Sequence, residues 1–366
     1  MVLSETEFRK LDHIRICIEK DVQTHNNWTG FKDVSFIHNA LPEISLEKVD
    51  TSLKFLGRRL EAPIIIEAIT GGTRESTKIN IPLAEAAEDL GLAMGVGSQR
   101  IAIDNPKRAS TFQIVRRKAP NTCIIGNIGA SQLADGYDVK EVQKAIDMIN
   151  ADVLAIHLNA LQEAIQPEGT PFYNGVLKKI EKITSALSIP VIVKETGAGI
   201  ASTEAAMLEK IGVKGIDVSG AGGTSWAAVE HYRSKQLSNY VNAKLGEVFW
   251  NWGIPTAVSI VEVCKSTKLT VIASGGIRTG IDAAKAISLG ANASGLALPL
   301  LKPALEGTIK NVLEMLIKEL KIAMFLIGAK SLETLHSVPL IITGQTAEWL
   351  RARGFPPEEY AKKAIN

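Results

Sequence analysis

The stretch PVIVKETGAGIASTEAAMLEKIGVKGIDVSG, residues 190–220, decides the fold of this chain. It begins with one apolar run, PVIVKET, and ends with another, GIDVSG, and the helical pattern between them stops at Gly212. Continuous apolar runs are typical of parallel strands that are covered on both faces. A glycine just past a helix is typical of a left-handed C-terminal residue. The stretch therefore predicts one strand–helix–strand unit.

Units of this kind recur along the chain from residue 63 onward. Helical patterns alternate with apolar runs, for example after Asp138, where Glu141 three residues on is a capping-box signal. No G-x-G-x-x-G fingerprint opens the first unit, as it would in an open dinucleotide-binding sheet. The pattern predicts an α/β fold of the (β/α)8 TIM barrel type. The expected strands are 63–70, 92–98, 123–129, 152–158, 190–196, 215–220, 269–276 and 293–298.

Three segments lie outside the regular units. Residues 1–62 form an N-terminal extension, in which TSLKFLGRRLEAP is expected to be a hairpin that turns near Gly57 and closes the bottom of the barrel. Residues 221–254 are a long connection rich in aromatic residues, and a helical tail follows residue 302. Because no linker rich in Pro, Gly or Ser separates these parts, residues 63–366 are predicted to be one barrel domain with its C-terminal tail.

Composition excludes several classes of function. Of the 366 residues 46% are hydrophobic, and the 22% that are charged nearly cancel to a net charge of +2. There is no basic stripe for nucleic acid, no apolar run long enough to cross a bilayer, and no signal-peptide pattern at the N-terminus. The three cysteines match no metal or redox spacing. We therefore expect a cytoplasmic protein with neither a nucleic acid nor a membrane as partner.

Polar side chains gather where the predicted strands end, which is where (β/α)8 barrels carry their function. Taken singly, each has a plain structural interpretation, such as a histidine that caps backbone groups or an acid on a solvated helix. Their occurrence at successive strand ends favours a single site. In chain order these ends carry Thr70, Ser98, Gln99, Arg100, Asn127, His157, Asn159, Gln162, Glu163, Lys194 and Ser219.

The turn after the seventh predicted strand and Lys194 at the end of the fifth together indicate a phosphorylated ligand that accepts electrons. SGGIRTG, residues 274–280, combines glycines, a helix start and Arg278, and with 295–297 it matches the phosphate site expected behind strands seven and eight. A plain glycine turn is the alternative. Lys194 interrupts an apolar strand, which is costly unless the ammonium faces negative charge in a cavity or reaches solvent at the edge. A cation at this place would stabilise a ring that becomes anionic on reduction.

Six motifs in this order resemble those of the type 2 isopentenyl diphosphate isomerase family: ITGGT, GSQR, HLNALQE, VKETGAGI, SGAGGTSW and SGGIRTG. The resemblance runs from Arg9 and Lys10 to TGQTAEWLRARG near the C-terminus. Ile69 and Ala160 depart from the family pattern, where methionine and proline are usual, and both changes affect packing more than chemistry. The resemblance implies an FMN-containing barrel that interconverts isopentenyl and dimethylallyl diphosphate in isoprenoid biosynthesis. It also implies a homo-oligomer, a tetramer or an octamer.

The same resemblance implies roles for individual residues. The flavin, reduced by NADPH, is expected to contact Ala68, Ile69, Thr70, Ser98, Asn127, Lys194, Ser219 and Thr224, with its phosphate at Gly275, Gly276, Ile277, Arg278, Leu296 and Ala297. The substrate diphosphate is expected at Arg9, Lys10, Ser98, Gln99, Arg100, His157 and Asn159, with Mg²⁺ on Glu163. Gln162, which also touches the substrate, is expected to be catalytic with Lys194 and Glu230; a surface position is the alternative for Glu230.

Other functions make different demands on such a barrel. An FMN-dependent 2-hydroxy-acid oxidoreductase needs a histidine followed closely by arginine after strand six, where this chain reads SGAGGTSW. IMP dehydrogenase needs a cysteine in the same loop, and Cys17, Cys123 and Cys264 all lie elsewhere. A non-catalytic flavin- or phosphate-binding barrel has no use for Gln162 and Glu163 beside a basic cluster. The isomerase is therefore the favoured interpretation.

Overall fold

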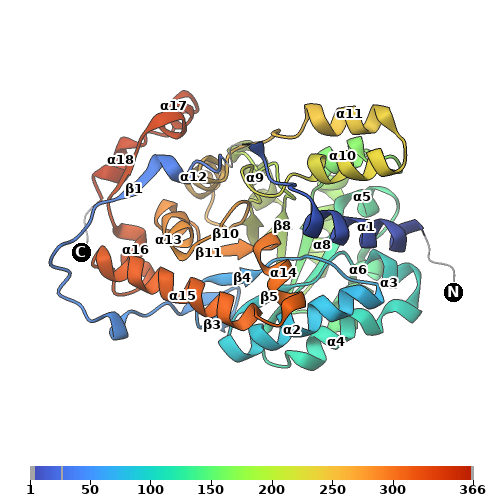
Figure 1. Ribbon diagram of the computed structural model, residues 1–366, viewed down its shortest axis with the longest axis horizontal. Helices are drawn as coiled ribbons and strands as arrows, with labels where there is room; N and C mark the ends of the chain where they lie inside the picture. The colour runs from blue at the N-terminus through green and yellow to red at the C-terminus, as the bar shows by residue number, and fades with distance from the viewer. Residues whose placement is uncertain (1–4, 26–27, 364–366) are drawn as a thin grey trace.

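The computed structural model describes residues 5–25 and 28–363. Its centre is a closed barrel of eight parallel strands, β4 to β11, in cyclic chain order (Figure 1). The predicted (β/α)8 barrel and all eight predicted strands are confirmed, although most strands are shorter than predicted because the residues that follow them turn to line the barrel mouth. The strands are β4 (Ile64–Ile66), β5 (Ala93–Gly95), β6 (Cys123–Gly129), β7 (Val153–His157), β8 (Val191–Lys194), β9 (Gly215–Asp217), β10 (Thr270–Ala273) and β11 (Ala293–Leu296).

The strands alternate between the barrel interior and the surrounding helices. Ile65 of β4 packs with the inner residues of the barrel, whereas Ile64 and Ile66 pack with the helix layer. This step of two residues is the ordinary pleat of a strand, and both faces of β4 are buried. Pairing of Gly295 with Ile65 joins β11 to β4 and closes the barrel.

Helices cover the outside of the barrel. Asp138 begins α6 with the predicted capping box, in which Glu141 completes the pair of side-chain to backbone bonds. Gly91 ends α2 in the left-handed conformation, again as its position predicts. The helices between strands are α2 (Arg74–Leu90), α3 (Arg100–Asp104), α4 (Ser110–Lys118), α5 (Ala130–Ala134), α6 (Val139–Ile149), α7 (Ala160–Ile165), α8 (Val176–Ala186), α9 (Ser202–Lys210), α12 (Thr256–Ser266) and α13 (Gly280–Leu289), with the 3-10 turn η4 (Pro106–Arg108).

A hairpin closes the bottom of the barrel. Its strands β2 (Leu53–Phe55) and β3 (Arg58–Leu60) pair antiparallel around Gly57, whose φ of 93° suits glycine. Phe55 and Leu60 have almost no exposed surface and pack with inner barrel residues such as Ile125. The hairpin thus fills the end of the barrel opposite its mouth.

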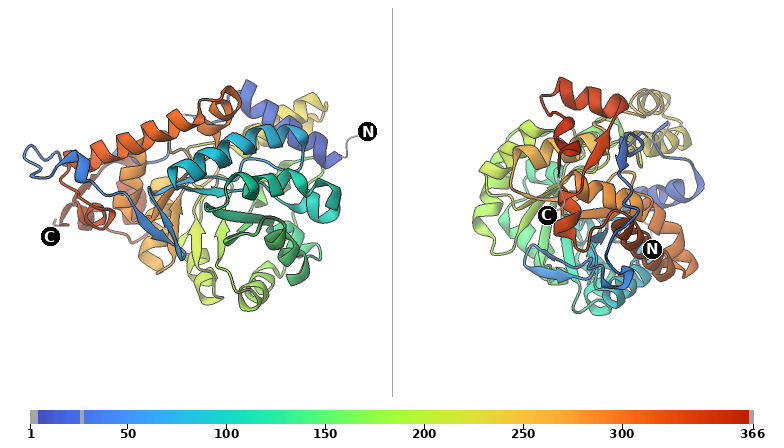
Figure 2. Two further views of the ribbon diagram at one scale, coloured as in Figure 1. Left: turned by 90° about the horizontal axis from the view of Figure 1, so that it is seen from below. Right: turned by 90° about the vertical axis from the view of Figure 1, so that its left-hand side faces the viewer.

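The remaining elements join the two ends of the chain and flank the mouth. Helix α1 (Glu5–Glu19) lies near the mouth, and β1 (Val34–Phe36) pairs antiparallel with β12 (Leu340–Ile342) of the tail. Figure 2 shows the long helix α15 running along one side of the molecule. The long connection forms the helices α10 (Trp226–Gln236) and α11 (Tyr240–Val248). The other elements are η2 (Phe31–Asp33), η3 (Leu46–Lys48), α14 (Leu298–Glu306), α15 (Ile309–Leu326), α16 (Leu332–Ser337), α17 (Gly344–Ala352) and α18 (Glu358–Ala361).

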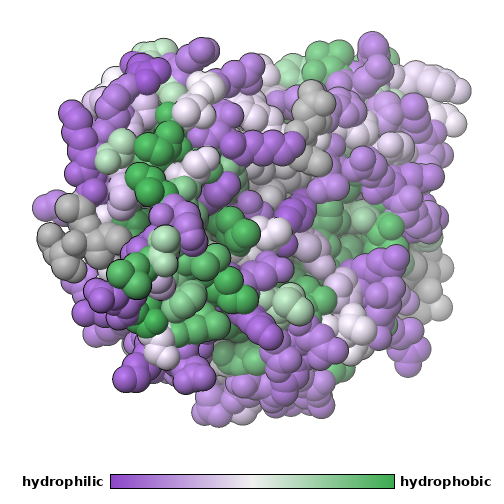
Figure 3. Space-filling model, turned by 60° about the vertical axis from the view of Figure 1, so that its left-hand side comes forward, coloured by the Kyte–Doolittle hydropathy of each residue, from purple (hydrophilic) through white to green (hydrophobic). Residues whose placement is uncertain are grey.

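One side of the molecule carries an apolar groove between β1, α13 and α15. Phe36, Ile281, Ile322 and Leu326 line it, and the last three are partly exposed. Figure 3 looks onto this side and shows apolar residues gathered there. In the part of the chain that the structure describes, no helix is long and apolar enough to span a membrane.

Removing the aromatic ring that plugs the barrel should destabilise the fold without touching its mouth. Phe55→Ala deletes a ring with 0% exposure, so the free energy of unfolding should fall by about 3–5 kcal/mol in a denaturant titration. Tyr240→Ala is the matched control, because that ring is 79% exposed and its loss should cost less than about 0.5 kcal/mol. Equal losses in the two variants would show that the hairpin is not part of the core.

Candidate active site

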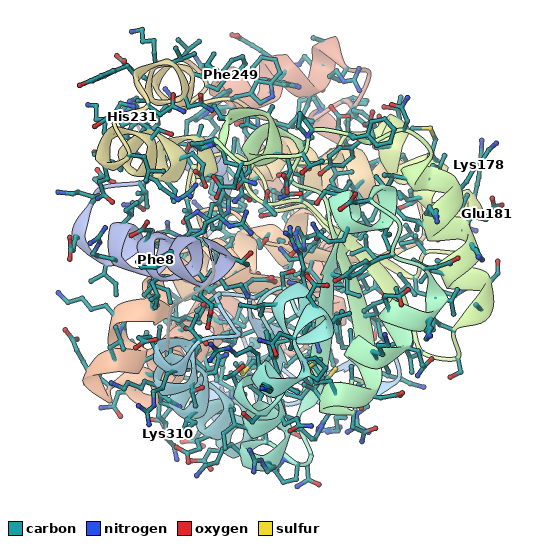
Figure 4. All side chains as sticks on the ribbon, turned by 90° about the vertical axis from the view of Figure 1, so that its right-hand side faces the viewer. Phe8, Lys178, Glu181, His231, Phe249 and Lys310 are labelled. Carbon is teal, nitrogen blue, oxygen red and sulfur yellow. The ribbon has the colours of Figure 1, made fainter. Side chains whose placement is uncertain are left out.

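A large cavity opens at the barrel mouth, and residues at all eight strand ends line it. It encloses about 1630 Å³ between the protein atoms, counting the part open to solvent. Side chains of α1 line the same cavity, and Figure 4 shows α1, with Phe8, beside α10, which carries His231.

The floor of the cavity is a buried lysine between two carboxyl groups. Lys194 Nζ lies 3.0 Å from Asp217 Oδ2 and 3.5 Å from Glu67 Oε2, and it donates to the backbone oxygen of Glu195 at 3.1 Å. Burial lowers the pKa of Lys194, but the two carboxyl groups more than offset this and raise it above its usual value. Lys194 is therefore a permanent cation inside the barrel, and the alternative of a solvent-reaching edge residue is wrong.

Glu67 and Asp217 were not predicted as site residues. Burial, followed by the charge of Asp217, raises the pKa of Glu67 to about 8. The sequence could have indicated both acids, because residues two apart in a strand face the same side. Glu67 follows the inward residue Ile65 of β4 by two positions, and Asp217 follows Gly215 of β9 by two.

The glycine turn after β10 packs tightly against the loop after β9. Gly275 and Gly276 have φ of 100° and 82°, and a Cβ on Gly275 would lie 2.2 Å from the backbone oxygen of Gly220 in that loop. Arg278 lines the cavity, and Gln23 Oε1 accepts hydrogen bonds from its Nη2 at 2.8 Å and its Nε at 3.2 Å. A glycine turn, the N-terminus of α13 and a guanidinium in one place suit a phosphate group. Gln23 was not predicted.

Basic side chains gather elsewhere in the mouth, two of them from α1. Lys10 Nζ donates to the backbone oxygens of Gly71 at 2.5 Å and Ser98 at 2.9 Å. Enclosure, with the charges of Arg9 and Arg100, lowers the pKa of Lys10 to about 7. Arg9, Lys10 and Arg100 thus lie close enough to influence one another, and Lys10 is partly deprotonated near neutral pH. Such a cluster suits a multiply charged anion.

His157 lies at the end of β7 in the neutral form. Its Nδ1 is 2.7 Å from Asn127 Oδ1, and Asn127 donates its own amide to the Val96 oxygen, so Nδ1 carries the ring proton. Enclosure, together with the charges of Lys194, Lys10 and Arg9, lowers the pKa of His157 to about 3. Nε2 is therefore the unprotonated nitrogen of the ring and can accept a hydrogen bond.

Glu163 faces the cavity, and its carboxylate accepts four hydrogen bonds. Oε1 accepts from Ser131 Oγ at 3.2 Å and Asn159 Nδ2 at 3.1 Å, and Oε2 from Gln166 Nε2 at 3.1 Å and Thr170 N at 2.8 Å. Within residues 5–25 and 28–363, no group of three or more His, Cys, Asp and Glu side chains is placed to hold a metal. Since Mg²⁺ often takes one protein carboxylate and completes its shell with phosphate oxygens and water, Glu163 fits such an ion only beside a bound phosphate.

Most predicted site residues line this one cavity, but three lie outside it. Gln99 is fully buried behind the cavity, where it donates to the Ala145 oxygen and accepts from Asn127 N, so its side chain does not reach the cavity in which its contact with substrate was predicted. Ile277 is buried behind the glycine turn. Glu230 lies behind His13. The residues that do line the cavity are Arg9, Lys10, Ala68, Ile69, Thr70, Ser98, Arg100, Asn127, His157, Asn159, Gln162, Glu163, Lys194, Ser219, Thr224, Gly275, Gly276, Arg278, Leu296 and Ala297.

Glu230 belongs to a buried ionic network beside the mouth. Its Oε1 lies 2.7 Å from His13 Nε2 and its Oε2 lies 3.2 Å from Arg233 Nη1, while Arg233 also pairs with Glu168 at 2.7 Å. With 0% exposure, Glu230 is not the surface residue that was the alternative. Burial raises the pKa of Glu230, but pairing with His13 and Arg233 brings it below its usual value. His13, which lines the cavity, was not predicted either.

Comparison with known proteins agrees with this geometry. The chain matches the family model described as FMN-dependent dehydrogenase over residues 5–118 and 174–341. It is 51% identical over 362 residues to an isopentenyl-diphosphate delta-isomerase of Methanosarcina barkeri, with 98% of each chain covered. Proteins of the same name from Methanothermobacter thermautotrophicus and Pyrococcus furiosus are 51% and 47% identical, covering 97% and 98% of this chain and 99% and 92% of theirs.

Solved structures show the same fold at lower identity. A mandelate oxidase variant aligns with a TM-score of 0.64 and 18% identity over 92% of this chain and 94% of its own. A second structure of that oxidase, with (S)-mandelic acid, aligns with a TM-score of 0.63 and 17% identity over 92% of this chain and 97% of its own. At this identity the likeness concerns the barrel alone.

The basic cluster predicts a pH-dependent affinity for inorganic diphosphate. The pKa of Lys10 is about 7 without an anion, and a bound anion raises it because it favours the charged ammonium. Affinity is therefore full below about pH 7 and falls by up to tenfold per pH unit above it. Calorimetric titrations between pH 6 and 9 should show weaker binding and a flatter pH course for Lys10→Gln. The exposed Lys107→Gln is the control, and parallel curves for Lys10→Gln and the parent would contradict the assignment.

Proposed function

Since this chain belongs to the isopentenyl-diphosphate delta-isomerase family, we propose that it interconverts isopentenyl diphosphate and dimethylallyl diphosphate in isoprenoid biosynthesis. The reaction moves one carbon–carbon double bond by adding a proton at one carbon and removing a proton from another. The observation that carries the proposal is that one cavity combines two separate anion sites, the glycine turn with Arg278 and the basic cluster with Arg9 and Lys10. A phosphorylated cofactor and a diphosphate substrate need such a pair.

FMN, the cofactor of the family, fits the floor and the glycine turn. Gly275, Gly276 and Arg278 would hold its phosphate, and Lys194 would lie at its ring. When bound and reduced, FMN supplies an electron-rich ring that can exchange a proton with the substrate. Lys194 stabilises negative charge on that ring, because its own charge is permanent and buried. The proposed reductant is NADPH. The other proposed contacts are Ala68, Ile69, Thr70, Ser98, Asn127, Ser219, Thr224, Leu296 and Ala297.

The substrate diphosphate would take the basic cluster, with its hydrocarbon end toward the ring. Arg9, Lys10, Arg100, His157 and Asn159 would hold the two phosphates through charge-assisted hydrogen bonds. Gln162, which is neutral, would lie at the hydrocarbon. Since α1 supplies two of the anion-binding groups and already lines the mouth, it would help to exclude the water that could capture an electron-poor intermediate.

Mg²⁺ would join Glu163 to the diphosphate. To reach the metal, a carboxylate oxygen has to exchange one of its present donors, Ser131 or Asn159, for the ion. That exchange is favourable only when phosphate oxygens supply further ligands. The protein without diphosphate should therefore bind Mg²⁺ weakly.

Glu230 would act through His13 rather than on the substrate. The carboxylate holds the imidazole Nε2 at 2.7 Å, and the ring of His13 stands edge-on to Trp226 at a centroid distance of 5.0 Å. These contacts fix the orientation of a ring that lines the cavity. Glu230 is thus proposed as a positioning residue, while Gln162 and Lys194 are proposed to contact the reacting partners.

A 2-hydroxy-acid oxidoreductase is the second candidate, because the mandelate oxidases share the barrel. Such chemistry needs a base beside the ring, and in that family a histidine supplies it from the loop after the sixth strand. Here that loop, after β9, contributes Ser219 and Thr224 to the cavity. The histidines of the cavity lining are His13 and His157, which come from α1 and β7. The isomerase fits these residues better.

The proposal extends to assembly and location. The apolar groove between β1, α13 and α15 is a surface that a second copy of the chain can cover. This supports a homo-oligomer, for which the family resemblance implies a tetramer or an octamer. We place the protein in the cytoplasm, with the isoprenoid diphosphate as its small-molecule partner.

Deuterium incorporation tests the proposed reaction directly. Protein incubated in D₂O with reduced FMN, Mg²⁺ and isopentenyl diphosphate should form dimethylallyl diphosphate that carries deuterium, as followed by proton NMR. Oxidised FMN without a reductant is the control and should give no turnover. Reduction of the flavin by mandelate or lactate, with no isomerisation, would favour the second candidate instead.

Two neighbouring substitutions separate metal binding from chemistry. Glu163→Gln keeps size but removes the charge that a hard cation needs, so the apparent Mg²⁺ affinity should fall by about ten- to a hundredfold, or about 1.5–3 kcal/mol. Gln162→Ala should lower kcat with little effect on the magnesium titration. FMN binding should be unchanged in both variants. A parental magnesium titration for Glu163→Gln would refute the metal assignment.

A further inference from the structure

Two acids and one base share a buried layer at the centre of the barrel, and their charges do not balance. Glu67, Lys194 and Asp217 are 7%, 8% and 1% exposed. If all three were ionised, the layer would hold a net charge of −1 with little water to solvate it. A small cavity directly beneath is lined by apolar residues such as Ile125, Ile192 and Ile272. One carboxyl group is therefore expected to keep its proton.

Hydrogen bonding decides which carboxyl group keeps the proton. Asp217 Oδ1 accepts from the Ser274 hydroxyl at 2.5 Å and from Ser219 N at 3.3 Å, and its Oδ2 faces Lys194 at 3.0 Å. Glu67 is farther from the lysine, at 3.5 Å, and its Oε1 lies against Gly295, where a Cβ would approach it to 2.3 Å. Asp217 thus has the closer cation and two further hydrogen-bond donors. Glu67 is the acid whose neutral form the site favours, in line with its pKa of about 8.

The surroundings of Glu67 leave few other groups that can influence it. Lys194 from β8 and Asp217 from β9 are the charged groups that face it. The strands β6, β10 and β11 contribute Asn127, Ser274 and glycine, which are neutral. Glu195 and His157 act one step away, through their interactions with Lys194.

We propose that Glu67 is a proton-holding residue beneath the flavin, which takes up a proton when the flavin is reduced and so links the potential of bound FMN to pH. The inference rests on the proposed binding of FMN in this cavity. Lys194 is the group through which Glu67 acts, since an ionised Glu67 cancels part of the field that the lysine presents to the ring. No assigned role of the site includes Glu67 or Asp217.

The proton and electron balance gives the sign of the effect. A two-electron donor, NADPH in the cell or dithionite in the test, adds two electrons and one proton to bound FMN and leaves one extra negative charge above Lys194. Where Glu67 is already ionised before reduction, that charge makes its carboxylate take up a second proton from solvent. Below the pKa of Glu67 in the oxidised protein one proton accompanies reduction, and above it two protons do.

Midpoint potentials of the FMN-loaded protein, measured spectroscopically between pH 6 and 10, test the proposal. With one proton the reduction equilibrium changes tenfold per pH unit, about 30 mV for a two-electron couple. With two protons it changes a hundredfold, so the slope should double above about pH 8, close to the pKa of Glu67. A single slope across this range in the parent protein would overturn the proposal.

Glu67→Gln is the isosteric variant that assigns the second slope. Because Gln resembles the protonated acid, the variant and the parent should have the same potential near pH 6.5. Above pH 8 the midpoint potential of the parent should fall below that of the variant, by a further tenfold change in the reduction equilibrium per pH unit. The potential of the variant should depend on pH with one slope throughout. Asp217→Asn is the second variant. Without the charge of Asp217 the pKa of Glu67 falls, so the steep segment should begin at lower pH.

Glu195→Gln is the matched control, because it removes a third buried carboxyl group near Lys194. Glu195 Oε2 accepts from the backbone N–H groups of Thr196, Gly197 and Ala198, and burial nevertheless raises its pKa to about 7. The steep segment should survive in this variant. Its loss here, with persistence in Glu67→Gln, would refute the role of Glu67. Failure of the parent to bind FMN would instead refute the proposed function.

Discussion

Closure of the parallel barrel is the constraint on which the rest of the molecule depends. The pairing of β11 with β4, Leu296 with Ile66, forces the carboxyl ends of all eight strands to one rim. Glu67, Lys194 and Asp217 come from three different strands and meet only because that ring is closed. The apolar layer beneath them lowers the local dielectric constant, which makes the ion pair of Lys194 with Asp217 stronger than it would be at a surface.

The N-terminal extension makes the two anion sites parts of one structure. Thr24 N donates to the Gly223 oxygen and Ser225 N to the Val22 oxygen, so the segment after α1 is bonded to the loop that packs against the glycine turn. Gln23, in the same segment, accepts from Arg278. The segment that follows α1 and the glycine turn therefore stabilise each other's conformation. A phosphate that organises one of them lowers the entropy cost of organising the other.

Much of this arrangement can be predicted from the sequence, because apolar runs and strand ends are local signals. The eight runs identified the barrel, and the polar residues after them identified the mouth. Gln99 could not be placed from its position, since Ser98 faces the cavity and the next residue turns behind it. Sequence alone does not reveal such a turn where a strand has already ended.

Acids proved harder to predict than bases. Lys194 stood out because a lysine in an apolar strand is costly, whereas Glu67 and Asp217 have no partner until the barrel brings them together. Glu230 bonds to His13, a residue 217 positions away, as well as to Arg233 on its own helix. A count of two residues from each inward apolar position, Ile65, Ile125, Ile192 or Ile272, reaches Glu67, Asn127, Lys194 and Ser274. That rule would have identified the layer above the core.

The pairing of β1 with β12 has a consequence for how the chain is made. Val34 pairs with Ile342 and Phe36 with Leu340, so β1 leaves the ribosome long before its partner has been made. The same holds for β4, because its three isoleucines are made long before β11, the strand with which they pair. Contacts of such long range slow folding and leave apolar segments uncovered during translation. Helix α1, which carries Arg9 and Lys10, packs against α10 and α14 and is made long before either of them, so the mouth cannot take its final form until α14 has been made.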